Sequence, residues 1–193
     1  MRLIKFTQLL LLILLPLGFC NATAQEIGNC TVKLAQLPRA GELRGFHLGM
    51  SADEFKARAP QLKLARTDAF GSSAVNVFPA FEPKIDPATF AELKTVSLEF
   101  LDNKLTSLWI GYEGSFKWQT MDEFTTGISA ALKLPAAWSA GSGARSSRLN
   151  CDDFTVIVAM IGQSPSLKLI DKAAQVTLDK RKAAAEEKAD QPQ

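Results

Sequence analysis

The chain contains a single histidine, His47, and lacks the sequence signatures of the common enzyme classes. A Ser-His-Asp or Cys-His hydrolase would have to use this one imidazole, and no nucleophile motif accompanies it. No phosphate-binding loop and no dinucleotide fingerprint is present. One imidazole and three scattered cysteines give no metal-binding motif. We therefore expect a non-enzymatic protein that has neither a cofactor nor a metal.

Two short segments resemble parts of catalytic sites but have simpler interpretations. Residues 141–143 are Gly-Ser-Gly without the outer residues of a nucleophile elbow, so we interpret them as a flexible loop. Asp152 and Asp153 are interpreted as a hairpin turn, because turns commonly use aspartate. A glycosidase pair of carboxylates needs no local motif, so a carboxylate-dependent secreted hydrolase stays open as an alternative.

The charge balance argues against polyanionic partners. The chain has 22 basic and 20 acidic residues. Arg2 and Lys5 lie in the first 24 residues, which contain no acid, so the rest of the chain carries 20 of each. A net charge of zero argues against nucleic acid or an anionic membrane surface as the main partner.

Residues 1–24 have the parts of a cleavable signal peptide. A short basic start is followed by an apolar stretch from Leu9 to Cys20, which is shorter than the roughly 20 residues that span a bilayer. Ala22-Thr23-Ala24 then has the small-x-small pattern of a cleavage site, which makes Gln25 the new N-terminus. We expect a periplasmic or secreted protein.

An alternative for this segment is a lipid anchor at Cys20. The preceding Leu17-Gly18-Phe19 loosely resembles a lipobox, although Phe19 is large where a small residue is usual. The remaining chain has no second apolar run that is long enough to span a bilayer. We therefore expect no transmembrane segment in the mature chain.

Removal of the signal peptide leaves two cysteines, Cys30 and Cys151. In an oxidising compartment such a pair is expected to form a disulfide. The alternative is two free buried thiols. The bridge would attach the start of the mature chain to a segment near its end.

Two helix starts of the same kind indicate an internal duplication. Ser51 with Glu54, and Thr120 with Glu123, each form the pattern of a capping box. The first helix should stop at Pro60 and the second before Pro135. Alternating apolar residues predict strands at residues 74–78, 96–100, 108–112, 149–151, 154–160 and 167–169.

These elements predict an α+β fold in which helices lie on one face of an antiparallel sheet. Two diverged α-β-β-β units are closed by a C-terminal helix from about Asp171. Between the strands at 96–100 and 108–112 we expect a three-residue loop, 102–104, because it puts both apolar sets on one face. Residues 25–181 form a single domain, and residues 182–193 form a solvated C-terminal tail with helical propensity.

The segment Leu48-Gly49-Met50-Ser51-Ala52-Asp53-Glu54-Phe55 resembles the Gly-Met-Ser/Thr helix start of small envelope proteins of the SmpA/OmlA type (the BamE family). It is also similar to the related folds of β-lactamase-inhibitor proteins, which carry two helix-plus-sheet units in tandem. The resemblance implies a periplasmic or secreted module for protein–protein interaction. The chain departs from the family in its length and its poor lipobox, so no specific partner carries over.

Aromatic residues are the best candidates for an interaction surface. Trp109 falls on the strand face opposite Leu108, while Tyr112, Trp118 and Trp138 lie in or near loops that flank the second helix. Exposed aromatic side chains are typical anchors of interfaces. The alternative is that these rings pack under the C-terminal helix as a second small core.

Export, duplication and missing catalytic motifs together predict a non-enzymatic module that binds another envelope or secreted protein. One alternative is a carrier of a small apolar ligand held between the sheet and the helices, which needs a cavity of several hundred Å³. The other is the carboxylate-dependent hydrolase.

Overall fold

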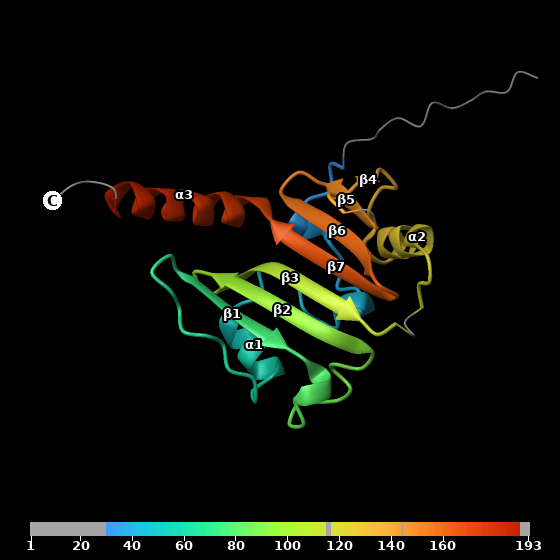
Figure 1. Cartoon of the computed structure of the whole chain (residues 1–193), viewed down its shortest axis with the longest axis horizontal. Coiled ribbons are helices and arrows are strands. Elements are labelled where there is room, and N and C mark those ends of the chain that lie inside the picture. The colour runs from blue at the N-terminus through green and yellow to red at the C-terminus, as the bar shows by residue number, and fades with distance from the viewer. Residues whose placement is uncertain (1–29, 115–116, 144, 190–193) are drawn as a thin grey trace, which may run out of the picture.

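Seven antiparallel strands form one sheet in the computed structural model, which describes residues 30–114, 117–143 and 145–189 (Figure 1). The order across the sheet is β1-β2-β3-β7-β6-β5-β4. The predicted signal peptide, its cleavage site and Cys20 lie outside the described residues. The strands are β1 (Ser72–Val77), β2 (Leu93–Leu101), β3 (Lys104–Tyr112), β4 (Ser139–Ala140), β5 (Ser146–Asn150), β6 (Phe154–Ile161) and β7 (Ser164–Asp171).

The sheet consists of two antiparallel meanders that meet in its middle. β1-β2-β3 follows helix α1 (Ala52–Arg58), and β5-β6-β7 follows helix α2 (Met121–Leu132) and the short β4. The last strands of the two meanders, β3 and β7, pair with each other through five residue pairs from Ser107↔Ile170 to Gly111↔Ser166. This arrangement confirms the α+β class and the repeated α-β-β-β order.

Both helices begin with the capping boxes that the sequence predicts. The backbone N–H of Glu54 donates to Ser51 Oγ at 3.1 Å, and the Ser51 N–H donates to Glu54 Oε2 at 2.7 Å. Thr120 and Glu123 make the same reciprocal pair at 3.2 and 3.3 Å. Each box satisfies backbone donors that a helix N-terminus otherwise leaves unpaired, and a good cap contributes about 1 kcal/mol.

The core lies on the face of the sheet that α1 and α2 cover. Alternate residues of β2 and β3, such as Leu98, Phe100 and Leu108, are fully buried there. Phe55 of α1 packs against Phe100 with ring centroids 5.7 Å apart. Side chains on one face of these strands therefore point towards the helices.

The β2–β3 turn differs from the sequence prediction. Leu101 pairs with Lys104, so the loop has two residues, Asp102 and Asn103, whose φ angles are 49° and 64°. Positive φ at both positions is the conformation that two-residue hairpins need, and Asp and Asn tolerate it. The three-residue loop is therefore wrong. A β-bulge at Thr106 adds the residue that keeps both apolar sets on the core face.

The N-terminal segment, residues 30–50, completes the covered side of the sheet. It contributes Leu43, Phe46 and Met50 to the core. Cys30 forms a disulfide with Cys151, which confirms the predicted pairing. The Leu34 N–H also donates to Asp153 Oδ1 at 2.7 Å, so two contacts hold the start of this segment beside the β5–β6 turn.

The C-terminal helix, α3 (Lys172–Ala189), runs along the opposite side of the sheet. Ala174 and Leu178 of α3 face Glu99 and Lys168 across a polar hollow. Further along, Arg181 donates to both carboxylate oxygens of Asp102, at 2.9 and 2.7 Å, and to the carbonyl of Phe70. Figure 1 shows the helix projecting beyond the sheet, and none of its described side chains is buried.

Across the part of the chain that the structure describes, no helix has the length and apolar character needed to cross a membrane.

Replacing Cys30 and Cys151 together by serine should lower the free energy of unfolding by about 2–5 kcal/mol, because the disulfide closes a long loop in the unfolded chain. Urea unfolding of the oxidised protein and of the double variant measures the difference. The wild type in excess dithiothreitol is the matched control and should unfold with the double variant. Equal midpoints for the oxidised and reduced wild type would contradict this role of the disulfide.

Candidate functional site

The face of the sheet opposite the core, here called the open face, is covered by α3 at one end and, among the described helices, by none at the other (Figure 1). Trp109 lies near its centre, paired with Ser97 on one side and Lys168 on the other. By their register, the residues on this face include Ser72, Ala74 and Asn76 on β1, Thr95, Ser97 and Glu99 on β2, Ser107, Trp109 and Gly111 on β3, Ser166, Lys168 and Ile170 on β7, and Thr155, Ile157 and Ala159 on β6.

An apolar hollow of about 240 Å³ lies on the open face at the end away from α3. Trp109 forms part of its wall, together with two exposed apolar side chains, Phe78 and Ile161. Phe78 is 51% exposed and Ile161 is 59% exposed, which is unusual for side chains of this size. The hollow is lined by Phe78, Lys94, Thr95, Trp109, Gly111, Ile161, Ser164, Pro165 and Ser166.

Gly111 keeps the bottom of the apolar hollow open. A Cβ atom at this position would approach Cγ2 of Thr95 to 2.7 Å, which is too close for two carbon atoms. Any larger residue would therefore displace Thr95 and change the shape of the hollow. The glycine is explained by this close approach of neighbouring strands.

Trp109 is the one aromatic candidate that the structure places on the open face. It is half-buried and points away from Leu108 and Ile110, as its position in the alternation predicts. Trp138 is half-buried on the other side of the sheet, where its indole N–H donates to Ser129 Oγ of α2 at 2.8 Å. The two tryptophans therefore belong to different surfaces.

Tyr112 and Trp118 are buried, so the expectation that they are exposed is wrong. Their exposed fractions are 0% and 5%. Trp118 stacks on Phe124 of α2 with ring centroids 4.6 Å apart, and Tyr112 meets Trp118 edge-on at 5.6 Å. The Tyr112 hydroxyl donates to the carbonyl of Glu42 at 2.9 Å, and burial raises the pKa of this phenol. The predicted alternative is also wrong, because these two rings pack against α2 and not under α3.

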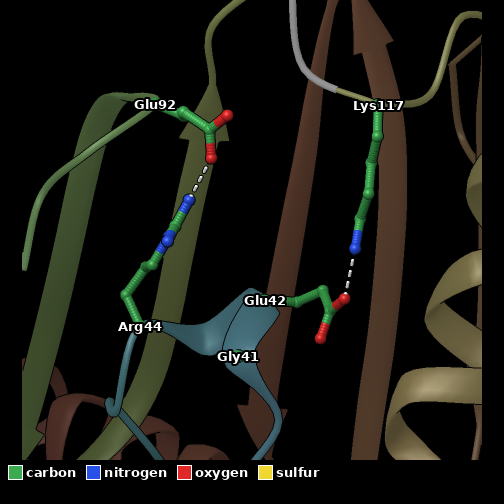
Figure 2. Close-up of a pocket in the computed structure, with 5 residues that line it drawn as sticks. All are labelled: Gly41, Glu42, Arg44, Glu92 and Lys117. Atoms are coloured by element: carbon green, nitrogen blue, oxygen red, sulfur yellow. Dashed lines mark hydrogen bonds and ion pairs between the residues drawn. The ribbon is translucent and has the colours of Figure 1, made fainter.

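A second pocket, of about 270 Å³, is charged and lies beside the short 3₁₀ helix η2 (Gly41–Leu43), whose residues Gly41 and Glu42 line it (Figure 2). Arg44 forms an ion pair with Glu92 and Lys117 forms one with Glu42, each with an N–O distance of 2.5 Å. Figure 2 shows the two pairs pointing away from η2 to segments on either side of it. We call this arrangement the charged clamp, because it ties η2 to the segments at the start of β2 and beyond β3.

The charged clamp also sets the protonation of Glu42. Burial alone would raise the pKa of this carboxyl, but hydrogen bonds from Lys117 and the backbone, with the charges of Lys117 and Arg44, hold it below its ordinary value. The general acid of a glycosidase needs a raised pKa. The pocket does bring two carboxylates together, Glu42 and Glu92, but the environment of Glu42 is the opposite of what that role requires.

Of the remaining polar candidates, His47 and Asp153 make contacts with nearby backbone groups. His47 is half-buried, with Nδ1 3.2 Å from the carbonyl oxygen of Leu48 and Nε2 buried without a hydrogen-bond partner. Asp153 accepts from the Leu34 N–H, and its carbonyl accepts from the Lys172 N–H, so it connects three segments at a turn. Within the described ranges, no group of three His, Cys, Asp or Glu side chains could hold a metal ion.

Sequence reasoning missed Phe78 and Ile161. Ile161 has a recognisable pattern, since it shares the alternation of Ile157 and Ala159 and so falls on the face opposite Val158. Phe78 follows the last residue of β1, and nothing local indicates that it approaches the β6–β7 turn. The apolar hollow therefore depends on which strands become neighbours.

Replacing Trp118 by alanine should lower the free energy of unfolding by about 3–5 kcal/mol, because the ring fills the core beside Phe124. Replacing Trp109 by alanine should cost about 1 kcal/mol or less, since this ring is half-exposed on the open face. Urea unfolding of both variants measures the contrast. A greater loss for Trp109 than for Trp118 would show that Trp109 is primarily a core residue.

Replacing Glu42 by glutamine should lower the free energy of unfolding at neutral pH by about 1 kcal/mol or less, as expected for one ion pair. The pKa of Glu42 is lowered in the folded state, so its stabilisation is present above the unfolded value of 4.5 and is lost as the pH falls through the folded value. The difference from wild type should therefore shrink below pH 4.5. Urea midpoints across pH measure it, with exposed Glu186→Gln as control. A difference that grows towards acid pH would contradict the assignment.

Comparison of the chain with protein-family models, curated proteins and solved structures finds no match. The resemblance of residues 48–55 to the BamE-type helix start therefore stays a prediction. The open face, the apolar hollow and the charged clamp are the features from which a function has to be inferred.

Proposed function

We propose that the chain is an exported, non-enzymatic module that binds another envelope or secreted protein through its open face. The observation that carries this proposal is the apolar hollow, where the exposed side chains of Phe78 and Ile161 and the half-buried ring of Trp109 leave apolar surface in contact with solvent. Interfaces concentrate their binding energy in such aromatic and aliphatic anchors. Exposed apolar surface of this kind is removed from water when a partner binds.

The location of the protein belongs to the same proposal. The Cys30–Cys151 disulfide supports an oxidising compartment, and the predicted signal peptide at residues 1–24 supplies the route to it. We propose that the mature chain lies in the periplasm or outside the cell. Attachment through a lipid on Cys20 is the alternative, and it would leave the open face available in the same way.

A protein partner fits the apolar hollow better than a small apolar ligand does. Pockets for small ligands usually enclose about 300–1,000 Å³ and bury most of the ligand. The apolar hollow is smaller, at about 240 Å³, and it lies on a sheet face. Between the sheet and the helices, where a carried ligand would sit, aromatic side chains such as Phe55, Phe100 and Phe124 are fully buried.

Site-specific photo-crosslinking in the cells that produce the protein tests the proposed function. A photoreactive amino acid at Asn76, which is exposed on the open face, should give one discrete crosslinked protein. The same group at Lys56, which is exposed on α1, is the matched control and should not give it. The Asn76 adduct should be lost when Trp109 is also replaced by alanine.

Two results would contradict the proposal. One is equal crosslinking from Asn76 and Lys56, which would show that the open face is not preferred. The other is an Asn76 adduct whose yield does not change in the Trp109→Ala background. In both cases urea unfolding must first show that the labelled variants are folded.

A further inference from the structure

We propose that the apolar hollow receives a large apolar side chain from a protein segment that carries acidic residues beside it. This inference rests on the proposed function and adds the chemistry of the partner. Its basis is the combination of apolar walls with a rim whose charged side chains are basic.

The walls of the apolar hollow select for an aliphatic or aromatic side chain. Trp109, Pro165 and the exposed side chains of Phe78 and Ile161 provide apolar contact on several sides. One polar side chain in the lining already has a partner in the protein: Ser166 Oγ donates to the carbonyl of Ala159 at 3.3 Å. The free energy gained when a side chain enters the hollow therefore comes mainly from the burial of its apolar surface.

The charges around the apolar hollow are basic. Lys94 is the one charged residue in its lining and is exposed. Lys168 pairs with Trp109 across β3 and β7, but it lines the separate polar hollow under α3 together with Glu99. Among the residues with a described placement, neither lysine forms an ion pair. Arg145 adds a third positive charge close to Ile161, where its guanidinium donates to the carbonyl of Gly162 at 3.1 Å.

No carboxylate lines the apolar hollow within the described part of the chain. Just before β2 the nearest acidic residue is Glu92, which is ion-paired with Arg44, and on β2 it is Glu99, which lines the separate polar hollow under α3. Along β3 the nearest is Glu113, which follows the end of the strand. An acidic residue beside an inserted apolar anchor would therefore approach Lys94 without meeting a like charge in the lining, whereas a basic residue would be repelled.

Selection from a displayed library of random linear peptides tests this inference without knowledge of the natural partner. The bait is the oxidised mature chain, Gln25–Gln193, immobilised through a tag. We expect the selected peptides to share a Leu, Ile, Met, Phe or Trp with Asp or Glu within a few residues of it. The strongest selected sequence is then synthesised, and its Kd is measured by fluorescence anisotropy at low and at high salt.

Two pairs of surface variants locate the peptide and separate apolar from electrostatic contributions. Phe78→Ser should weaken binding about tenfold, and Phe81→Ser is its control, because Phe81 is 82% exposed and does not line the hollow. Lys94→Glu should weaken binding about fivefold at low salt and less at high salt, with exposed Lys84→Glu as its control. All four side chains are exposed, so each variant should keep the wild-type urea midpoint.

The outcomes separate this inference from the proposed function. Peptides that lose binding with Phe78→Ser but lack acidic residues and ignore Lys94→Glu would overturn the acidic partner and leave the binding face in place. Peptides that ignore Phe78→Ser, or a library that yields no binder, would overturn the inference that the hollow receives a linear apolar segment. Crosslinking from Asn76 decides the proposed function independently of all these results.

Discussion

The antiparallel pairing of β3 with β7 is the interaction on which the rest of the structure depends. It joins a three-stranded part (β1-β2-β3) to a four-stranded part (β7-β6-β5-β4), which would otherwise be separate sheets, each with one more exposed edge. On the core face the pairing sets Leu108 beside Leu169 and Ile110 beside Leu167. On the open face the same register sets Trp109 beside Lys168. One set of backbone hydrogen bonds therefore builds the centre of the core and positions the central residue of the candidate site.

Within the described residues, the core face of this sheet is covered along its length and the open face only at the end where α3 lies, and the sequence explains why. The core face is lined by large apolar residues, so α1, α2 and the N-terminal segment must cover it. The open face is mostly Ser, Thr, Ala and charged residues, which tolerate water. α3 has no apolar stripe with which to cover this face, and it is held there by the contacts of Arg181 with Asp102 and Phe70. The apolar hollow is thus an exception within a face that is otherwise hydrophilic.

Much of the fold could be predicted because its determinants are local. The capping boxes at Ser51 and Thr120 specify where helices begin, and alternation specifies which side of each strand is buried. Alternation also placed Trp109 correctly. Alternation also puts Tyr112 on the core side with Leu108 and Ile110, and this burial conflicts with its choice as an interaction candidate near the loop that leads to the second helix. The β2–β3 loop was mispredicted because Leu105 also needs burial, and only a bulge at Thr106 accommodates both Leu105 and Leu108.

The candidate site was harder to predict because it is assembled from distant segments. Phe78 follows β1, Gly111 belongs to β3, and Ile161 and Pro165 flank the β6–β7 turn. Their meeting depends on the strand order, in which β7 lies beside β3 and β6 beside β7. Neither the spacing of these residues nor their composition encodes that order. Trp109 could be recognised as an unpaired aromatic residue, but the hollow around it could not.

The charged clamp and the apolar hollow lie at the same end of the sheet, and this proximity would link stability to the proposed binding. Glu92 of the clamp precedes β2, whose second residue, Lys94, lines the hollow. Tyr112, which donates to the carbonyl of Glu42, directly follows Gly111 at the bottom of the hollow. The N–H of Glu113 also donates to the carbonyl of Glu92, so the two strand ends are tied to each other. A rim that is already held in place loses little conformational entropy when a partner binds, and this preorganisation increases the affinity that a small apolar contact can provide.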